Sequence, residues 1–369
     1  MSFKDLIEQP GILKAIEDLG YTTPTPIQKQ AIPLILSGCD LRGSAQTGTG
    51  KTAAFILPAL CKLAKPSTLH GRGPRVLILV PTRELAIQVA EEASKYCKYL
   101  DRIKTVCIYG GAPYPIQNRQ LARPYEILVA TPGRLMDHMN RGKINFSRVE
   151  MFILDEADRM LDMGFIRDIR AIMAHLRDER QTLFLSATIT PDIQQLISTI
   201  LKDPVTVSVR RGETSDHVEQ DVVRVEGGKP AKEEKLVELL GDPEFSKVLI
   251  FGETKWGVQR LADRLAHRGF KVAAIHGNKS QPQRQKALND FKAERIQALI
   301  ATDVAARGLD IPNVSHVINY DPPKQYEDYV HRIGRTGRAG AMGKALTFVA
   351  DGPEAFAAGS GADRGGRRR

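Results

Sequence analysis

Short apolar runs, each followed at once by a few polar residues, recur along most of the chain. In the first half, RVLILV precedes residues 81–85, EILVA precedes 131–134, FIL precedes 155–158 and LFL precedes 186–188. Runs of this length are typical of strands buried on both faces, and helical segments separate them. The pattern therefore predicts βαβ crossovers and a parallel sheet, with all these polar clusters along the one edge where α/β sheets bind ligands.

The same pattern resumes in the second half of the chain. VLIF precedes residues 252–254, VAAI precedes 276–277, ALIA precedes 302–303 and HVIN precedes 320–321. Between the halves, SVRRGETSDHVEQ is polar and has no apolar period, which indicates a linker. Because 369 residues are too many for one ordinary core, we expect an α/β protein of two similar domains. The predicted boundaries are 1–209 for the first domain, 210–217 for the linker and 218–350 for the second domain.

The two ends of the chain differ from this pattern. Apolar residues between Leu6 and Leu19 have helical spacing, so the first thirty residues predict a helix, a loop and a second helix. Pro10 and Gly11 are expected to break the first piece. At the other end, residues 351–369 are dominated by Gly, Ala and Arg, which predicts a short disordered basic tail. Its arginines would add nonspecific affinity for a polyanion, or the tail is simply solvated.

The polar cluster with the most chemistry is DEAD, residues 155–158, where three carboxylates follow an apolar strand. Clustered carboxylates repel one another and resist desolvation, so they need a cation or an open polar site. The alternative is a solvated acidic start of a helix, where acids suit the helix dipole. On its own, the cluster does not distinguish the two.

An upstream segment decides between these alternatives. AQTGTGKT, residues 45–52, follows the phosphate-loop pattern G-x-x-x-x-G-K-[ST], with Ala45 in place of the first glycine. Its glycines let backbone N–H groups turn toward a phosphate, Lys51 supplies a positive charge, and Thr52 supplies a hydroxyl ligand for magnesium. A glycine-rich turn with an incidental lysine is the less favoured alternative. Asp155 then has a role as the acid that holds this magnesium.

HRIGRTGR, residues 331–338, places three arginines and two glycines in eight residues of the second half. Arginine is the side chain best suited to stabilise phosphate charge in a transition state. The alternative is a basic solvated turn, which explains the charge but not the regular spacing. The segment is therefore expected to complete the site from the second domain.

Composition adds three expectations. A hydrophobic content of 42% and a charged content of 26% are typical of a soluble globular protein, and the net charge of +10 favours a polyanion as partner. No apolar run is long enough to span a membrane, and the N-terminus lacks the apolar core of a signal peptide. The four cysteines form no C-x-x-C pair, which indicates reduced, buried thiols. A cytoplasmic protein without membrane contact is expected.

In kind and order, these motifs resemble those of the DEAD-box ATP-dependent RNA helicases. The resemblance runs from Phe3 to about Val349 and rests on GYTTPTPIQ, AQTGTGKT, PTREL, Gly110–Gly111, TPGR, DEAD, SAT, VLIF, TDVAARGLD and HRIGRTGR. It implies two tandem RecA-like domains, ATP and Mg²⁺ as cofactors and RNA as the partner. We expect the chain to act as a monomer.

The resemblance also implies roles for individual residues of the ATP site. Gln28 would recognise the adenine edge, with Phe3 packing nearby, and Asp310 would contact the ribose. The implied nucleotide-binding set is Phe3, Gln28, Gln46, Thr47, Gly48, Thr49, Gly50, Lys51, Thr52 and Asp310, with Thr52 and Asp155 on the metal. The implied catalytic residues are Lys51, Glu156 as the base that activates water, and Arg335 and Arg338 as arginine fingers. Asp158, Ser186 and Thr188 would couple hydrolysis to RNA.

For RNA, the resemblance points to groups suited to phosphates, sugars and the 2′-hydroxyl rather than to base edges. They are Pro81, Thr82, Arg83, Gly111, Thr131, Gly133 and Arg134 in the first domain, and Arg284, Thr302 and Asp303 in the second. The binding is therefore expected to tolerate any sequence and to weaken with salt.

The implied function is RNA-stimulated ATP hydrolysis, in which closure of the two domains bends one RNA strand and opens a few base pairs. The runner-up is an ATP-gated RNA clamp whose slow hydrolysis matters little. A DNA helicase is disfavoured by Gln28 together with DEAD.

Three features are not absorbed by the resemblance. Arg123–Pro124 stands where the family has a glycine-containing turn, and the tail stands where the family has a final helix, so the second domain is expected to be less stable. Trp256, the only tryptophan, is expected to pack on an amphipathic helix.

Overall fold

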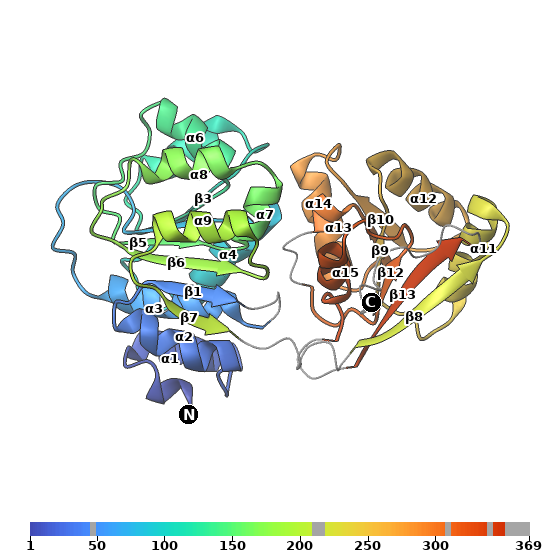
Figure 1. Cartoon of the computed structure of the whole chain (residues 1–369), viewed down its shortest axis with the longest axis horizontal. Helices are drawn as coiled ribbons and strands as arrows, with labels where there is room; N and C mark the ends of the chain where they lie inside the picture. Colours follow the sequence, from blue (N-terminus) through green and yellow to red (C-terminus); the bar gives the residue numbers. More distant parts are fainter. Residues whose placement is uncertain (45–48, 209–217, 307–310, 338–341, 351–369) are drawn as a thin grey trace, which may run out of the picture.

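The computed structural model consists of two lobes, each built on a parallel β-sheet (Figure 1). It describes residues 1–44, 49–208, 218–306, 311–337 and 342–350. Five predicted site residues lie outside these ranges. The predicted linker and the predicted tail, where the family has a final helix, also lie outside them. The five are Gln46, Thr47, Gly48, Asp310 and Arg338.

The sheet of the first lobe has seven strands in the order β3-β4-β2-β5-β6-β1-β7. Their bounds are β1 Leu41–Ser44, β2 Val76–Leu79, β3 Thr105–Ile108, β4 Ile127–Ala130, β5 Met151–Leu154, β6 Gln181–Ser186 and β7 Val205–Ser208. Side chains alternate between the faces, so Ile153 joins one hydrophobic core while Phe152 and Leu154 join the other.

Helices cover both faces of this sheet, as Figure 1 shows from the side. One core contains side chains of η1 Phe3–Asp5, α1 Pro10–Asp18, α2 Pro26–Leu36, α3 Lys51–Ala64 and α4 Arg83–Tyr96. The opposite core contains side chains of α5 Tyr114–Leu121, α6 Pro132–Asn140, α7 Ala157–Asp162, α8 Ile166–Met173 and α9 Pro191–Ile200. With both faces covered, only the edges of the sheet are left for chemistry.

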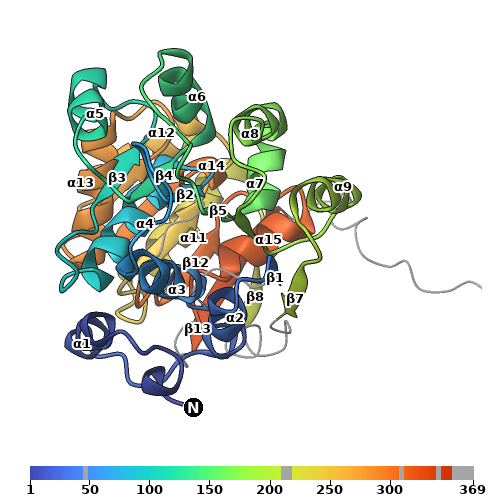
Figure 2. The same ribbon diagram turned by 90° about the vertical axis from the view of Figure 1, so that its left-hand side faces the viewer.

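The second lobe repeats this three-layer arrangement with six strands in the order β10-β11-β9-β12-β13-β8. The strands are β8 Val218–Val225, β9 Val248–Phe251, β10 Val272–Ile275, β11 Ala298–Ala301, β12 His316–Asn319 and β13 Gly343–Ala350. α11 Gly228–Gly241 and α12 Lys255–His267 cover one face, while α13 Gln281–Lys292, α14 Asp303–Ala306 and α15 Tyr326–Ile333 cover the other. The face with α13 to α15 lies toward the first lobe (Figures 1 and 2).

The predicted strands are confirmed, because each of the eight apolar runs coincides with a strand of a parallel sheet to within a few residues. Pro10 differs from its prediction: it begins α1 instead of breaking a helix. The missing N–H of proline costs nothing in the first helical turn, where that group has no partner within the helix. Within the described ranges, each helix is too short or too polar to cross a bilayer.

The prediction that Trp256 packs in the protein is wrong, because 59% of this residue is exposed. The buried side chains of α12 are Val258, Leu261, Ala262 and Leu265. At 100° per residue, these four lie on the side of the helix opposite Trp256. The amphipathic helix is as predicted, but the indole is on its solvent face.

Candidate active site

The strand order sorts the polar clusters of the first domain into two groups along one edge of the sheet. The phosphate loop, SAT and DEAD follow β1, β6 and β5, which are consecutive in the sheet. PTREL, TPGR and Gly110–Gly111 follow β2, β4 and β3, which are also consecutive. The residues expected to bind ATP therefore occupy one half of the edge, and those expected to bind RNA occupy the other half.

The described end of the phosphate loop leads directly into α3. Gly50 is the N-cap with φ +88°, a left-handed conformation that favours glycine, and Lys51 is the first residue of the helix. A Cβ at Gly50 would lie 2.5 Å from Gln28 Nε2, so a side chain at this position has no room. The N-terminus of α3, whose N–H groups lack helical partners, is suited to an anionic phosphate.

Gln28 fixes the phosphate loop from the neighbouring helix. Its Nε2 donates to the carbonyl oxygen of Gly50 at 3.1 Å, and its Oε1 accepts from the N–H of Thr25 at 3.0 Å. The second contact belongs to a capping box at the start of α2. Phe3 is buried in the hydrophobic core of the first domain. The structure thus holds the amide of Gln28 on both sides and places it against the last glycine of the phosphate loop.

The acid cluster is buried at the end of β5. Asp155 and Glu156 are both buried, and Asp155 Oδ1 accepts the N–H of Glu156 at 3.0 Å. Burial raises the pKa of Asp155 to about 6, although the nearby charge of Lys51 opposes this shift. Glu156 has φ +53° in the left-handed region, which costs a non-glycine residue about 1–3 kcal/mol. A strained, buried acid pair beside a lysine has the character of a functional site.

Asp158 joins the DEAD box to the SAT segment, as predicted for the coupling residues. Its Oδ2 accepts from the N–H groups of Ala187 and Thr188 at 3.0 and 2.9 Å, and from Thr188 Oγ1 at 3.0 Å. Ser186 Oγ donates to the carbonyl oxygen of Thr188 at 2.6 Å and closes this turn. One carboxylate oxygen therefore holds two backbone donors and a hydroxyl in place, so any movement of SAT must move Asp158 as well.

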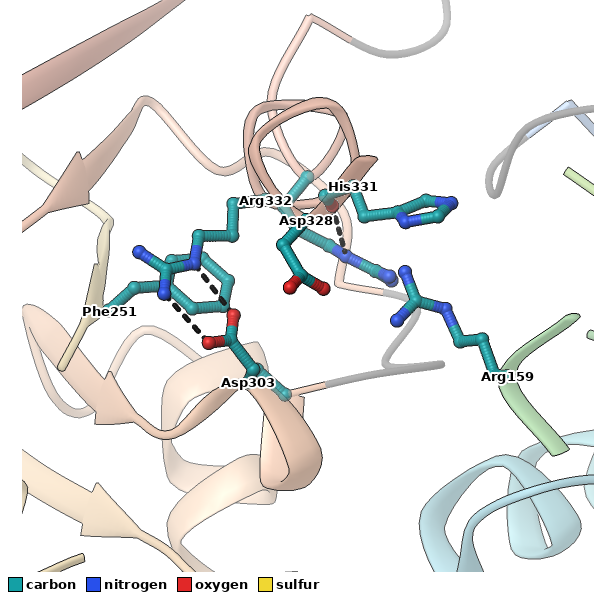
Figure 3. Close-up of a pocket in the computed structure, with 8 residues that line it drawn as sticks. Arg159, Phe251, Asp303, Asp328, His331 and Arg332 are labelled. Atoms are coloured by element: carbon teal, nitrogen blue, oxygen red, sulfur yellow. Dashed lines mark hydrogen bonds and ion pairs between the residues drawn. The ribbon is translucent and has the colours of Figure 1, made fainter. Parts of the chain in front are cut away.

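A pocket between the domains brings Arg159 of the first together with α15 of the second (Figure 3). Its other polar lining residues are Asp303, Asp328, His331, Arg332 and Arg335. Burial, followed by the charge of Arg159, lowers the pKa of His331 to about 3, so its imidazole is neutral at physiological pH. Arg335 is buried, and its Nε donates to the carbonyl oxygen of His331 at 3.3 Å. The predicted finger Arg335 thus shares a pocket with Arg159, the residue that follows the DEAD box in the other domain.

Asp303 was predicted to contact RNA, but in the structure both of its oxygens bind Arg332. Arg332 Nε and Nη2 donate to Asp303 at 2.6 and 2.7 Å, and Nη1 donates to Asn319 Oδ1 and to the carbonyl oxygen of Asp321. This bidentate pair joins α14 to α15 (Figure 3). Its place in the fold is to position α15, which ends two residues before Arg335. Thr302, also predicted for RNA, is half-buried directly before Asp303.

Arg284 was also predicted to contact RNA, but it forms an ion pair across the two domains. Its Nη2 lies 2.8 Å from Glu84 Oε2, and both side chains are buried. Gln281, one turn earlier on α13, donates to Glu84 Oε1 at 3.4 Å. Glu84 belongs to PTREL at the start of α4. The pair therefore joins the RNA half of the first domain's edge to the second domain.

The remaining predicted RNA residues lie together at the ends of β2, β3 and β4. Thr82 and Thr131 are the N-caps of α4 and α6, while a Cβ on Gly111 would meet the guanidinium of Arg83. Arg134 is buried, and its Nη1 donates to the carbonyl oxygen of Ala112 and to Gln117 Oε1. Arg134 therefore holds the loop that follows Gly111. Pro81 is buried beside Thr82, and Gly133 borders open space.

Four residues at this site had no role predicted from the sequence. They are Glu84, Arg159, His331 and Arg332. Glu84, His331 and Arg332 lie inside recognised motifs and Arg159 directly follows the DEAD box, so the motifs indicated their neighbourhood. Their partners lie in another motif or in the other domain, and spacing along the chain does not report such pairs.

The protein has two parallel-sheet domains. The first carries a phosphate loop and an acid cluster, and the second contributes a buried arginine to the pocket between the domains. These features define a two-domain ATP-binding protein of the RecA-like type. The family model "DEAD/DEAH box helicase" matches residues 25–196, and "Helicase conserved C-terminal domain" matches residues 231–340. The chain is 46% identical over 350 residues to DEAD-box ATP-dependent RNA helicase 20 of Arabidopsis thaliana, with 94% of this chain and 70% of that protein covered. It is 46% identical over 345 residues to ATP-dependent RNA helicase DBP2 of Candida albicans, where the matched region is 92% of this chain and 61% of that protein.

The solved structures give the same result. S. cerevisiae Dbp5 bound to RNA and ADP BeF3 has a TM-score of 0.84 at 32% identity, covering 95% of this chain and 90% of that one. Mss116p bound to ssRNA and AMP-PNP has a TM-score of 0.87 at 29% identity, covering 95% and 75%. The chain belongs to the DEAD-box family of ATP-dependent RNA helicases. The predicted family, the two tandem RecA-like domains and the enzyme class, an RNA-dependent ATPase, are confirmed.

Proposed function

We propose that this chain uses ATP to close its two domains on RNA, which separates short duplexes or remodels RNA–protein complexes. The observation that carries the proposal is the shared surface at the acid cluster. Arg159, three residues after Glu156, lines one pocket with His331 and Arg335 of the other domain. A site divided in this way is complete only when the domains are together, so ATP and RNA each favour closure and each promotes the other's binding.

The proposed nucleotide site uses Gln28 for the adenine edge and the loop up to Thr52 for the phosphates. Mg²⁺ fits the residues present, because Thr52 and Asp155 supply the hard oxygen ligands that this ion takes, one or two at a time, beside phosphates and waters. Burial raises the pKa of Asp155, and a dication would stabilise the charged form of this carboxylate. When bound, Mg²⁺ neutralises charge on the phosphates.

The proposed chemistry assigns one task to each remaining side chain. Glu156 accepts a proton from the attacking water while holding it in line with the γ-phosphate. Lys51 and Arg335 supply positive charge, and Arg338 is proposed to do so as well. Asp158 links the phosphate site to the SAT segment, because its hydrogen bonds with Thr188 transmit a change at the phosphate site to that segment.

For RNA, we propose that the backbone and side chains of Pro81, Thr82, Arg83, Gly111, Thr131, Gly133 and Thr302 contact the sugar–phosphate chain. These groups recognise no base edge, so binding tolerates sequence. Arg134, Arg284 and Asp303 are proposed to position this surface, because each guanidinium or carboxylate is bound to protein groups. Dbp5 bound to RNA and ADP BeF3, and Mss116p bound to ssRNA and AMP-PNP, support the same pair of ligands here.

The comparisons also support a closed arrangement of the domains. A DEAD box protein from Methanococcus jannaschii is 40% identical to this chain, yet its TM-score is 0.52, well below that of the RNA-bound Dbp5 at 32% identity. Since the fold of each domain is shared, the difference lies in how the domains are placed relative to each other.

We propose domains at residues 1–209 and 218–350, because β7 ends the first sheet at Ser208 and β8 begins at Val218 in the second. A monomer suffices, since both halves of the site lie on one chain. Four free cysteines support a reducing, cytoplasmic compartment.

The direct test compares ATP hydrolysis with RNA and with DNA of equal length and sequence. We expect RNA to raise kcat by at least tenfold and DNA to have little effect. Equal stimulation by both would contradict the proposed specificity for RNA. A strand-displacement assay on a short RNA duplex then separates the two functions still open: ATP-dependent release of a strand favours the helicase, and its absence despite ATP-dependent RNA binding favours the clamp.

Breaking the Glu84–Arg284 pair should weaken closure of the two domains without removing a contact to ATP or to RNA. In the presence of a non-hydrolysable ATP analogue, Glu84→Gln and Arg284→Gln should each raise the Kd for RNA roughly tenfold or more, because each leaves a buried charge unpaired. Without nucleotide, both variants should bind RNA like the wild type. The double variant should be no weaker than either single variant.

The matched control for this cycle is Arg268→Gln, which breaks the exposed Arg268–Glu234 pair within the second domain. It should leave RNA affinity unchanged. Losses that simply add in the Glu84 and Arg284 double variant would mean that the two residues act separately, and the assignment of the pair to closure would then be abandoned.

A further inference from the structure

Three exposed apolar side chains follow three adjacent strands of the second sheet. Val304 follows β11, Trp256 follows β9 and Tyr326 follows β12, with exposed fractions of 54%, 59% and 70%. β9 lies between the other two strands, so Trp256 is at the centre of this carboxyl edge. A large exposed indole on the ligand-binding edge of an α/β sheet indicates a binding site.

The turn that carries Trp256 is held on both sides. Before it, the N–H of Glu253 donates to Asp321 Oδ2 at 2.9 Å, beyond the end of β12. After it, Gln259 Oε1 lies 3.1 Å from His276 Nε2, beyond the end of β10. Thr254 caps α12 by accepting from the N–H of Gly257 at 3.0 Å. The indole therefore stands on a fixed turn of α12, which lowers the entropy lost when a flat partner stacks on it.

The charges around Trp256 favour an anionic partner. The Nζ of Lys255 lies 5.8 Å from the indole, and in the described part of the chain no carboxylate pairs with this lysine. Burial and then the nearby charges of Lys279, Arg284 and Lys255 lower the pKa of His276, which places these cations around the end of β10. The neighbouring acids are paired: Glu253 with Lys324, and Asp321 with Lys232.

We propose that Trp256 stacks on an unpaired base of the bound RNA and that Lys255 contacts the adjoining phosphate. This inference rests on the proposed function and extends its RNA surface from Thr302, at the end of β11, to the end of the neighbouring strand β9. A flat aromatic side chain beside an unpaired cation is the usual means of holding single-stranded nucleic acid without choosing a sequence.

Because Trp256 is the only tryptophan, its emission is a direct probe of the proposed contact. The full chain would be titrated with a single-stranded uridine oligonucleotide and a non-hydrolysable ATP analogue, with binding followed independently by the anisotropy of a label on the RNA. We expect the emission to fall in step with the anisotropy. Trp256→Ala should raise the Kd by about 5- to 100-fold, while Trp256→Phe should retain most of the affinity.

Salt dependence separates stacking from charge. Trp256→Ala should leave the slope of log K against log salt unchanged, whereas Lys255→Gln should reduce it by about 0.7 to 1, the effect of one phosphate contact. Val222→Ala, which trims an exposed side chain on the distant edge strand β8, is the matched control and should change neither value.

Steady emission while the labelled RNA binds, together with an unchanged Kd for Trp256→Ala, would overturn this inference and point to a protein partner for the indole instead. In that case RNA binding by the wild type keeps the proposed function intact. A wild-type chain that binds no labelled RNA in any nucleotide state would instead remove both proposals.

Discussion

Replacing Glu156 by glutamine should stop ATP turnover while ATP and RNA still bind. Glutamine has nearly the same shape as glutamate and can occupy the same buried position, but it cannot accept the proton of the attacking water. General-base catalysis contributes about 10²- to 10⁴-fold, so kcat for RNA-stimulated hydrolysis should fall by at least about 100-fold. The measurements are phosphate release at saturating ATP and RNA, and RNA anisotropy with ATP present.

The matched control for this experiment is the neighbouring Asp155. Asp155→Asn removes a proposed magnesium ligand, so it should weaken binding of ATP with Mg²⁺ as well as turnover. Normal turnover in Glu156→Gln would exclude Glu156 as the base. Loss of folding in that variant would instead assign Glu156 a structural role at its strained turn, where φ is +53°.

The architecture could be predicted from the sequence because buried parallel strands carry a strong local signal. Strands such as β5 and β9 are short and apolar throughout, because helices cover both faces of each sheet, and a polar cluster follows each of them directly. The position of each cluster at one edge then follows from the parallel direction alone. Only the order of the strands within each sheet was not available from this signal.

Pairs between distant residues could not be predicted. Glu84 and Arg284 are 200 positions apart; Arg284 was predicted to contact RNA, and Glu84 had no predicted role. Asp303 and Arg332 lie in two motifs expected to serve two different ligands, yet they bind each other. In each case the sequence reports the type of a charged group, whereas its role depends on the nearest opposite charge in the folded chain.

The exposure of Trp256 is a different kind of error, since the sequence contained the answer. The apolar stripe of α12 begins at Val258, and the helical period places Trp256 on the opposite side. Its hydrophobic character suggested burial, but its position on the helix indicated exposure. The position is the better guide, because a helix on a sheet buries one face only.

We propose that Asp158 couples hydrolysis in the first domain to the position of the second. Its Oδ2 holds the SAT turn, while Arg159 and Lys51 keep the pKa of this carboxyl below its usual range even though burial raises it. Asp158 is therefore charged whenever the domains are closed. A change in the position of Lys51 as phosphate leaves would alter the field at Asp158 and thus the geometry of SAT.

Replacing Arg335 by alanine should reduce kcat about 10³-fold or more, the typical contribution of an arginine finger. The guanidinium lies in the pocket beside Arg159 and His331, where a developing charge on the γ-phosphate would be poorly screened by water. Arg335→Lys should not restore the rate, because one ammonium group does not reproduce the planar set of donors. The measurement is RNA-stimulated ATP hydrolysis at saturating ATP, with RNA affinity in the absence of nucleotide expected to stay unchanged.

Arg332→Ala is the control that separates catalysis from folding in α15. Arg332 carries the bidentate pair with Asp303, so its loss should lower the free energy of unfolding of the second domain by about 3–5 kcal/mol. A purely structural role for Arg335 would make the two variants alike, with Tm falling together with activity in both. A catalytic role requires that Arg335→Ala lose turnover at a Tm close to that of the wild type, since the Asp303–Arg332 pair, and not Arg335, holds the helix in place.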